Sequence, residues 1–381
     1  MNSSRLNLMI SAGEASSDMH AAHAINELRK RGVEFDCFGM GADKLNAAGM
    51  ELTLDCRELA VIGIVDVLIN YPRFMRRLAT LRKTMKERRP DLLVIVDYPD
   101  FNLKLAETAK ELGIPVLFYI SPQIWAWRKK RIHRIGQLVS HMAVLFPFEV
   151  DVYTEAGIPV TYVGHPLVDD AKSEFSKDAA REHLGLSTTG KLVALLPGSR
   201  NGELKRNLPV MLATAAALKK NQPDIQFVLP IAPTLERGAV DELIQQASIK
   251  VHTVDAQSYH AMRAADAVLS ASGTATLETA MIGTPMAVMY VINKINYAIM
   301  KRLIQIDDIG LVNIVAGRRI CQEFVQDEAQ PVAMAQELEK CLNDTHYRQT
   351  MKDELEQVRQ KMGSGGASLR VAELIESLVT R

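Results

Sequence analysis

Carboxylates stand where apolar runs of this sequence end, a position from which they can accept protons. Asp97-Tyr-Pro-Asp100 directly follows the run Leu92–Val96. A carboxylate at the carboxyl end of a buried parallel strand is well placed to act as a general base, so Asp97 is the candidate base. The alternative is a structural role, in which Asp97 fixes the loop or Asp100 caps the following helix. The residues alone leave both interpretations open.

A second polar segment, Gly13-Glu-Ala-Ser-Ser-Asp18, follows the first apolar run, Leu6–Ile10. It opens a helical pattern, and short polar side chains at a helix start often cap the helix. The same side chains can instead bind the hydroxyl groups of a sugar. Glu14, Ser16 and Asp18 are therefore candidate binding residues, with capping as the alternative.

A turn of small residues, Leu196-Pro-Gly-Ser-Arg200, follows an apolar run later in the chain. Gly198 permits a tight turn, and Ser199 can cap a helix. The planar, permanently charged fork of Arg200 suits a phosphate. The alternative is an ordinary strand-to-helix turn whose arginine points into solvent.

A similar turn lies in Ser270-Ala-Ser-Gly-Thr-Ala-Thr-Leu-Glu278. The residues that open its helix are Ser272, Gly273 and Thr274. Backbone N–H groups at a helix start suit a diphosphate. Glu278 comes one helical turn after Thr274 and shares its face, where it can accept hydrogen bonds from ribose hydroxyls or simply benefit from the helix dipole. Together with Arg200, this segment favours a site for a nucleoside diphosphate.

Other motifs of nucleotide and metal chemistry are absent from the sequence. It contains no G-x-x-x-x-G-K-[ST] loop, and Gly39-Met-Gly41 lacks the third glycine of a dinucleotide fingerprint. It contains no Asp-x-Asp pair of the kind that holds a cation for a nucleotide sugar, and its nine histidines show no metal-ligand spacing. We therefore expect no metal and no other cofactor.

Short apolar runs alternate with helical patterns in two successive series. The expected strands of the first series are Leu6–Ile10, Phe35–Phe38, Leu92–Val96, Val116–Ile120, Met142–Leu145 and Thr161–Val163. Those of the second are Lys191–Leu196, Gln226–Leu229, Lys250–Val254, Ala267–Ser270 and Met286–Tyr290. Apolar strands separated by helices, such as Asp18–Arg31 and Leu103–Leu112, indicate parallel sheets covered on both faces. We therefore expect an α/β protein with two doubly wound, Rossmann-like domains facing a central cleft.

The two series place the domain boundary shortly after Gly164-His-Pro166. We expect a first domain over residues 1–168 and a nucleotide-binding domain over residues 169–362. The glycine-rich stretch at Gly363 precedes a last helix, Ser368–Val379. Residues 363–381 are thus expected to form a C-terminal helix that can cross to the first domain or to a partner subunit.

Composition excludes several classes of protein. The 381 residues contain 45 basic and 45 acidic side chains, and a formal charge of zero argues against a general nucleic-acid binder. The four cysteines form no C-x-x-C pair, which favours reduced thiols. The N-terminus has no secretory pattern, and no stretch approaches the roughly 18 apolar residues of a spanning helix. These features predict a cytoplasmic protein.

The region between Val61 and Arg89 combines an apolar stripe with clustered cations. Its apolar residues recur at three- and four-residue spacing: Ile64, Val67, Leu68, Tyr71, Phe74, Met75 and Leu78. Pro72 is expected to interrupt this stripe and start a second helix. A second basic cluster is Arg128-Lys-Lys-Arg131. The stripe either packs on the core of the domain or contacts a membrane surface.

The chain resembles the lipid-A-disaccharide synthase family, glycosyltransferases of the two-domain GT-B fold, over its full length. The resemblance rests on Gly13-Glu-x-Ser-x-Asp18, Glu58-Leu-Ala-Val-Ile-Gly63, Asp97-Tyr-Pro-Asp-Phe-Asn102, Ser121-Pro-Gln-Ile-Trp-Ala-Trp-Arg128, Leu145-Phe-Pro-Phe-Glu149, Gly164-His-Pro166, Leu196-Pro-Gly-Ser-Arg200, Ser272-Gly-Thr-Ala-Thr-Leu-Glu278, and Asn313 with Ala316-Gly-Arg318. The Ser-Pro-x-x-Trp-Ala-Trp-Arg string is long and chemically unusual, which makes it specific. Two positions depart from the family pattern: Ser17 replaces a glycine and Val312 a proline.

The resemblance implies an activity. Members join UDP-2,3-diacylglucosamine to 2,3-diacylglucosamine 1-phosphate, with inversion, and release UDP and a β-1,6-linked disaccharide. Asp97 then resembles the catalytic base, and Arg200, Glu278 and Asn313 match positions tied to the UDP-sugar. Members also form homodimers, in some cases by exchange of the C-terminus, so a homodimer is compatible with this chain.

Acylated substrates also imply a lipid surface. They favour the membrane interpretation of the stripe, because clustered cations attract anionic headgroups. The expected membrane contacts are Val67, Leu68, Phe74 and Met75. The protein is then expected to lie on the cytoplasmic face of the inner membrane as a peripheral protein.

Two other functions remain as alternatives. A UDP-sugar 2-epimerase shares the two-domain architecture and a UDP site, but it needs no apolar surface for lipid chains. A bilobed binding protein without catalytic activity is a different class. Such proteins are typically exported, and the lack of a secretory pattern argues against this one.

Overall fold

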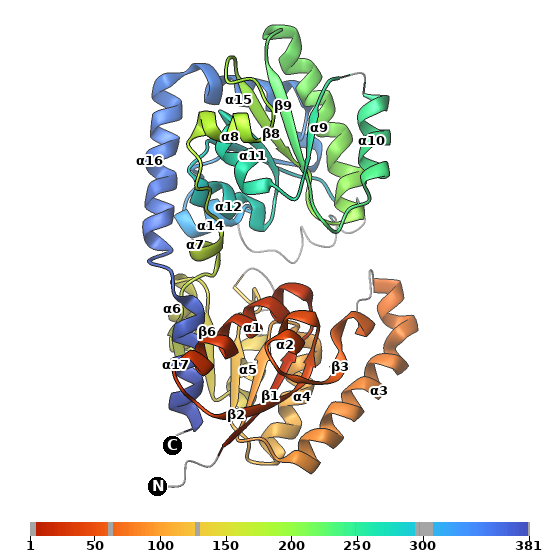
Figure 1. Ribbon diagram of the computed structural model, residues 1–381, viewed down its shortest axis with the longest axis vertical. Helices are drawn as coiled ribbons and strands as arrows, with labels where there is room; N and C mark the ends of the chain where they lie inside the picture. Colours follow the sequence, from red (N-terminus) through yellow and green to blue (C-terminus); the bar gives the residue numbers. More distant parts are fainter. Residues whose placement is uncertain are drawn as a thin grey trace. The chain divides into compact units, whose positions relative to one another are not determined.

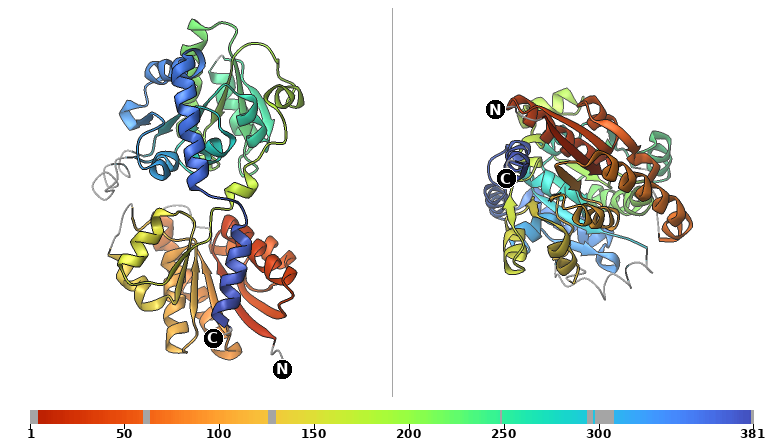
Figure 2. Two further views of the ribbon diagram at one scale, coloured as in Figure 1. Left: turned by 90° about the vertical axis from the view of Figure 1, so that its left-hand side faces the viewer. Right: turned by 90° about the horizontal axis from the view of Figure 1, so that it is seen from below.

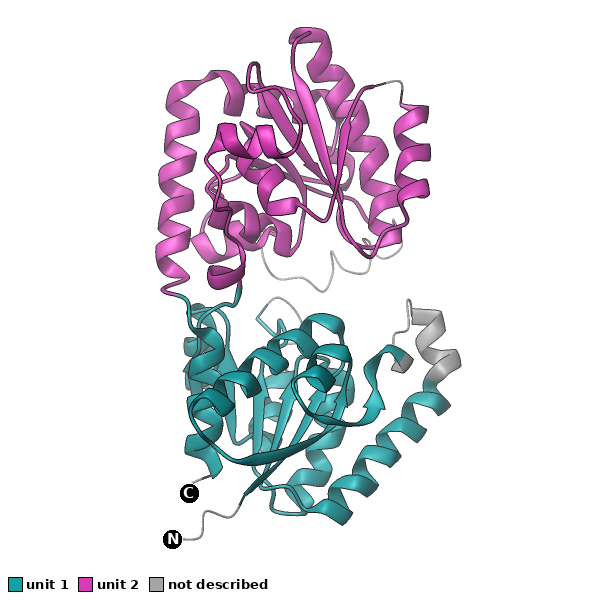
Figure 3. Cartoon of the chain, viewed as in Figure 1, with its two compact units in different colours: residues 1–166, 365–381 teal, residues 167–364 magenta. Residues whose placement is uncertain are grey.

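The computed structural model describes residues 5–59, 64–125, 130–247, 249–293, 297 and 308–379, with the side chains of residues 58–70 outside this description. The chain forms two compact units (Figure 3). Unit 1 contains Met1–Pro166 and Gly365–Arg381, and unit 2 contains Leu167–Ser364. The sequence-based boundary after residue 168 therefore differs from the division in the structure by two residues.

Unit 1 is built on a sheet of seven parallel strands in the order β3-β2-β1-β4-β5-β6-β7 (Figure 1). The strands are β1 (Leu6–Ala12), β2 (Phe35–Gly41), β3 (Glu51–Asp55), β4 (Leu92–Val96), β5 (Val116–Tyr119), β6 (His141–Val144) and β7 (Val160–Tyr162). Every residue of β4 is buried, as expected for a strand covered on both faces. The order reverses between β1 and β4, so the loops that follow these two strands leave the sheet side by side.

The helices of unit 1 cover this sheet. They are α1 (Ala15–Lys30), α2 (Asp43–Ala47), the 3-10 helix η1 (Cys56–Leu59), α3 (Ile64–Arg88), α4 (Pro99–Glu111), α5 (Arg131–Leu138), α6 (Phe148–Glu155) and α17 (Ala367–Val379). Leu81 of α3, Phe101 of α4 and Ile135 of α5 belong to one buried apolar cluster with side chains of the strands. The hydrophobic effect of this burial holds the helices on the sheet.

The last helix, α17, belongs to unit 1 although it ends the chain. It packs against α1 and touches β4 (Figures 1 and 2). Arg31, the C-cap residue of α1, pairs with Glu373 at 3.2 Å and with Glu376 at 2.8 Å, and the Arg370 Nε donates to the Val163 carbonyl at 2.7 Å. Gly363 and Gly366 both have positive φ, and the chain passes from unit 2 to unit 1 between them.

Unit 2 is built on six parallel strands in the order β10-β9-β8-β11-β12-β13. They are β8 (Leu192–Leu196), β9 (Gln226–Ile231), β10 (His252–Asp255), β11 (Ala267–Ala271), β12 (Met286–Tyr290) and β13 (Glu323–Val325). The order reverses between β8 and β11, whose residues are buried throughout. As in unit 1, the loops after the two strands at the reversal lie next to each other.

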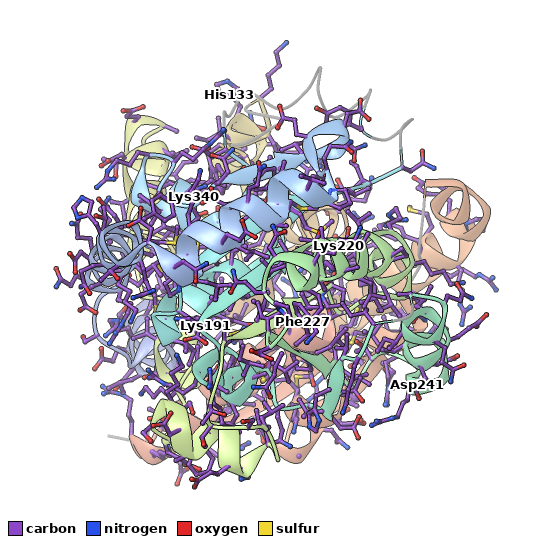
Figure 4. The ribbon with its side chains drawn as sticks, turned by 90° about the horizontal axis from the view of Figure 1, so that it is seen from above. His133, Lys191, Lys220, Phe227, Asp241 and Lys340 are labelled. Atoms are coloured by element: carbon purple, nitrogen blue, oxygen red, sulfur yellow. The ribbon has the colours of Figure 1, made fainter. Side chains whose placement is uncertain are left out.

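The described helices of unit 2 pack on both sides of this sheet. They are α7 (Leu167–Asp170), α8 (Lys177–His183), α9 (Asn201–Asn221), α10 (Arg237–Gln246), α11 (Ser258–Ala264), α12 (Thr274–Ile282), α14 (Leu311–Ala316), the 3-10 helix η2 (Gln326–Glu328), α15 (Pro331–Asn343) and α16 (Thr345–Lys361). Helices α9 and α15 lie side by side, with Lys220 and Lys340 labelled on them in Figure 4.

The fold class expected from the sequence is confirmed, since both sheets are parallel and alternate with helices. Two strands were missed, β3 and β13, and both lie at a sheet edge. Glu51–Asp55 is only partly buried and Glu323–Val325 has three residues, so neither makes the continuous apolar run by which the other strands were recognised.

The expected break at Pro72 is wrong, because α3 continues through it from Ile64 to Arg88. A proline inside a helix loses one backbone hydrogen bond and costs about 3 kcal/mol. Leu78, Leu81 and Met85 are fully buried further along the same helix. Burial of one such side chain contributes about 1.5–3 kcal/mol, so the helix can absorb the cost of the proline.

Candidate functional site

Asp97 occupies a sharp loop between β4 and α4. Asp97 and Tyr98 have φ values of +48° and +47°, both in the left-handed region. Such a conformation costs about 1–2 kcal/mol for a residue other than glycine, so surrounding contacts must hold it. A Cβ at Gly13 would lie 2.5 Å from the Tyr98 ring, so only glycine permits this packing between the loops after β1 and β4.

The surroundings of Asp97 suit a proton acceptor. Burial, followed by the negative charge of Glu14, raises the pKa of its carboxyl to about 6, although a hydrogen bond from the Tyr98 N–H acts in the opposite direction. At neutral pH the carboxylate is therefore mostly ionised but more basic than an ordinary aspartate. A base is most effective when its pKa lies near the working pH.

Asp18 does not have the binding role expected from the sequence. Its side chain is 2% exposed, and its carboxylate accepts hydrogen bonds from the backbone N–H groups of Ala42 at 2.6 Å, Lys44 at 2.9 Å and Leu45 at 3.2 Å. Both oxygens are thus occupied at the start of α2. Asp18 stabilises the turn after β2 and has no free oxygen positioned for a ligand.

The other expected acceptor residues lie at the surface. Glu14 and Ser16 are exposed at the start of α1. Asp100 lies in the first turn of α4, not at the N-cap position, and its 71% exposed side chain pairs with Arg131 at 2.5 Å. The capping interpretation of Asp100 is therefore wrong. Acceptor binding by Glu14, Ser16 and Asp100 stays a prediction.

Unit 2 contains a cavity of about 370 Å³ at its own strand-order reversal. The loops after β8, β9 and β11 line it, together with the starts of α11 and α12. Expected donor-site residues that line it are Arg200, Ser272, Gly273, Thr274 and Glu278. In open α/β sheets, ligands bind outside the carboxyl ends of strands at such a reversal.

The start of α12 gives this cavity a positive end. Gly273 has φ +145°, which other residues rarely adopt, and α12 begins at Thr274. Ser272 anchors the loop, because its N–H donates to the Met289 carbonyl at 2.7 Å and its hydroxyl to the Ile309 carbonyl at 2.9 Å. Helix N-termini stabilise anions, so a phosphate group fits here.

Arg200 is 76% exposed and is held by Glu203. The Arg200 Nη1 donates to Glu203 Oε1 at 3.0 Å, and the Ser199 N–H donates to Glu203 Oε2 at 3.2 Å. Glu203 also approaches Gly198, where a Cβ would lie 2.4 Å from its Oε2. One carboxylate therefore organises the whole turn. Glu203 is not among the residues expected from the sequence, although it lies one helical turn after Arg200.

Glu278 is partly buried in the wall of the cavity. Burial, partly offset by a hydrogen bond with the Tyr259 side chain, raises the pKa of its carboxyl to about 6. Tyr259 belongs to α11, and no spacing in the sequence connects it with Glu278. A carboxylate with one such partner retains acceptor capacity for hydroxyl groups of a ligand.

Asn313 does not face the cavity, which corrects the sequence-based expectation. It is fully buried, and its Nδ2 donates to the Cys321 carbonyl at 2.8 Å and to Glu323 Oε1 at 2.7 Å. Its Oδ1 accepts from the backbone N–H groups of Ile320 and Cys321, both at 2.9 Å. All its polar atoms are used inside unit 2. Val312, beside it, is also fully buried.

The expected membrane residues fall into two groups. The side chains of Val67 and Leu68 lie outside the described residues. Phe74 and Met75 are half-buried and pack against the core cluster, and the Phe74 ring makes an edge contact with Phe101 at 5.1 Å. At these two positions the stripe faces the core, as the structural alternative predicted. The string from Ser121 is described up to Trp125 and is outside the description at residues 126–129.

Two negative findings apply to the described part of the chain. No cluster of three or more His, Cys, Asp or Glu residues there has the geometry of a metal site. No helix there is long and apolar enough to cross a membrane.

Comparison with solved structures identifies the class of this fold. A UDP-GlcNAc 2-epimerase from Neisseria meningitidis, solved with UDP-GlcNAc, superposes with a TM-score of 0.60 at 13% identity, covering 99% of this chain and 100% of that one. The calicheamicin glycosyltransferase CalG4 superposes with a TM-score of 0.63 at 14% identity, covering 100% and 99%. Two Rossmann-like units of this kind define the GT-B class, which includes glycosyltransferases and epimerases.

Sequence comparison resolves the class into a family. Residues 8–374 match the family model described as lipid-A-disaccharide synthetase, and this chain belongs to that family. The lipid-A-disaccharide synthase of Geobacter sulfurreducens is 42% identical over 368 residues, which cover 97% of this chain and 96% of that protein. That of Nitrosococcus oceani is 43% identical over 372 residues, covering 97% and 95%.

Proposed function

We propose that this chain is an inverting hexosyltransferase of lipid A biosynthesis. Its donor is UDP-2,3-diacylglucosamine and its acceptor is 2,3-diacylglucosamine 1-phosphate. The products are the β-1,6-linked disaccharide 1-phosphate and UDP. The family match over residues 8–374 carries this proposal, and the candidate sites at the two strand-order reversals support it.

The proposed chemistry divides between the two units. Asp97 of unit 1 takes the proton from the acceptor 6-hydroxyl as that oxygen bonds to the anomeric carbon. The bond from this carbon to the diphosphate breaks on the opposite side, and UDP leaves with the electron pair. Arg200 and the start of α12 stabilise the charge that develops on the diphosphate, and Glu278 binds the ribose.

Incubation with both lipid substrates tests the activity directly. We expect UDP release together with a tetra-acylated disaccharide phosphate, each detected by mass spectrometry. Incubation with a UDP-sugar alone distinguishes the epimerase alternative, since an epimerase converts the sugar without an acceptor. Conversion of this kind, without any disaccharide, would overturn the proposal.

We expect catalysis to be independent of a divalent metal, because Arg200 and the N-terminus of α12 already supply positive charge at the proposed diphosphate site. Turnover in EDTA should stay within about twofold of turnover in buffer, whereas a metal that neutralised the diphosphate would contribute far more. Initial rates of UDP release measure this. Loss of activity in EDTA that Mg²⁺ or Mn²⁺ restores would contradict the expectation.

We further propose that the protein binds the cytoplasmic face of the inner membrane as a peripheral protein, with α3 as the contact. Exposed cations support this assignment, and those of α3 include Arg73, Arg76, Lys83 and Lys86. Tyr71 adds an aromatic ring that is 49% exposed. Basic residues near an anionic surface each contribute about 1 kcal/mol.

Removing two of these cations should weaken membrane binding without harming the fold. The double substitution Arg73→Gln and Arg76→Gln should weaken the free energy of membrane binding by about 2 kcal/mol. The affinity for anionic vesicles should therefore fall about 30-fold. Sedimentation with vesicles measures this, and circular dichroism checks folding. Lys220→Gln with Lys250→Gln, two exposed cations of unit 2, is the matched control. Equal binding by both double variants would place the contact elsewhere.

Homodimer formation is the remaining part of the proposal. In this chain α17 occupies its own unit 1, where Arg31 pairs with Glu373 and Glu376. A dimer formed by exchange of the C-terminus would transfer these same contacts to the partner. Light scattering of the parent and of Arg31→Glu measures the oligomeric state and its dependence on this contact.

A further inference from the structure

Two fully buried polar residues, Ser11 of β1 and Asn102 of α4, meet beneath the Asp97 loop. The Ser11 hydroxyl donates to Asn102 Oδ1 at 2.6 Å. The Asn102 Nδ2 donates to the Asp97 carbonyl at 2.7 Å and to the Ser11 carbonyl at 3.2 Å, with the Val96 carbonyl at 3.3 Å. The amide thus joins β1 and β4 at their carboxyl ends.

Burying this pair costs desolvation free energy unless all its polar atoms form hydrogen bonds. The Asn102 side chain has two N–H donors and one carbonyl oxygen, and each has a partner here. An apolar residue would fill the same space at lower desolvation cost. The geometry therefore suggests that the pair does more than fill the core.

The loop above the pair needs to be held. Asp97 and Tyr98 are consecutive residues with positive φ, neither of them glycine. The Tyr98 carbonyl accepts from the N–H groups of Phe101 at 3.2 Å and Asn102 at 3.1 Å. The Asp97 carbonyl has the Asn102 side chain as its partner, so this amide bonds directly to the residue that carries the candidate base.

We propose that Asn102 is a positioning residue that holds the Asp97 carboxylate in its reactive orientation. The hydrogen bond from the Ser11 hydroxyl fixes the Asn102 side chain for this role. This inference rests on the proposed function, in which Asp97 accepts the proton of the acceptor hydroxyl. Neither Asn102 nor Ser11 touches a substrate in it. They act only through the backbone of the loop.

The test is Asn102→Ala, with kcat, KM for the donor, and the pH profile as readouts. Displacing a reacting group by about 1 Å can cost 10²-fold, so kcat should fall by about 10-fold or more. KM for the UDP-sugar, which unit 2 binds, should change less than about twofold. The loosened loop admits water to Asp97, and burial is the main cause of its raised pKa. The acidic limb of kcat should therefore move to lower pH.

Matched variants separate positioning from simple destabilisation. Thr108→Ala removes another buried polar side chain from α4 and should leave the acidic limb in place. Ser11→Ala should shift the limb in the same direction as Asn102→Ala but less, and the double variant should resemble Asn102→Ala alone. If Asn102→Ala does not fold, Ser11→Ala carries the test, with folding checked by thermal unfolding.

Two results would overturn the inference. One is an Asn102→Ala protein whose kcat falls only as far as its folded fraction, with an unmoved acidic limb. The other is strictly additive effects of the Ser11 and Asn102 substitutions. An NMR titration of the Asp97 carboxyl in the parent and in Asn102→Ala tests the same pKa change without turnover. It therefore tests the effect of Asn102 on Asp97 even if the proposed transferase reaction is not observed.

Discussion

Asp97→Asn is expected to lower kcat by about 10²–10⁴-fold while donor binding stays nearly intact, because the substitution removes the proposed general base and little else. Asparagine has almost the same shape, so the buried network beneath the loop should persist. UDP release under saturating substrates measures kcat, and calorimetric titration with UDP measures donor-site binding in unit 2. A loss of kcat together with unchanged UDP affinity is the expected pattern.

Two neighbouring carboxylates provide the controls for this prediction. Asp100→Asn makes the same chemical change three residues away, on an exposed side chain paired with Arg131. Glu14→Gln removes the charge that helps to raise the pKa of Asp97. If Asp97→Asn retained near-normal turnover and either control lost it, the base would have to be reassigned to that residue.

The pH profile gives the same assignment a second test. The base must be ionised, and burial followed by the Glu14 charge raises the pKa of Asp97 to about 6. Activity should therefore rise with pH through this value and level off above it. Glu14→Gln removes a negative charge, which lowers the pKa of Asp97 and moves the acidic limb to lower pH. A limb unmoved by Glu14→Gln would argue against Asp97 as the titrating group.

The fold could be predicted from the sequence because its central strands are buried on both faces. Runs such as Leu92–Val96 and Leu192–Leu196 are apolar throughout, and that pattern fits few other structures. Edge strands carry a weaker signal, which explains why β3 and β13 were missed. Pro72 shows a different limit, since local propensity favours a break but the burial of Leu81 and Met85 further along α3 favours continuation.

Site residues could be predicted where their position after a strand brings them to the site. They could not be predicted where hydrogen-bond partners elsewhere in the fold determine their role. Asp97, Arg200 and Gly273 each follow a strand at a reversal of strand order, so the topology brings them to a loop edge. Asp18 and Asn313 were misassigned, because the sequence does not indicate which backbone N–H groups lie within reach of a polar side chain. The Asn102 side chain likewise has a hydrogen-bond partner that the sequence does not indicate, since Ser11 of β1 lies 91 residues before it in the chain.

Arg200→Ala should raise the Kd for UDP about 10²-fold, the second large effect that we expect. A guanidinium that donates two charge-assisted hydrogen bonds to a diphosphate contributes about 1.5–3 kcal/mol for each bond. Its exposed side chain and its place in the cavity wall make this role possible without burying a charge. Calorimetric titration with UDP measures the affinity. Arg237→Ala, an exposed arginine of unit 2 that pairs with Asp255, is the matched control.

Glu203 makes the prediction for Arg200 more specific, because its carboxylate accepts a hydrogen bond from the Arg200 guanidinium. If Glu203 acts by orienting the guanidinium, Glu203→Gln should weaken UDP binding in the parent but not in the Arg200→Ala background. Glutamine still accepts from the Ser199 N–H, so the turn itself should survive the change. Equal losses in both backgrounds would mean that Glu203 supports the turn independently of Arg200. Unchanged UDP affinity in Arg200→Ala would remove this arginine from the donor site and leave the start of α12 as the proposed phosphate contact.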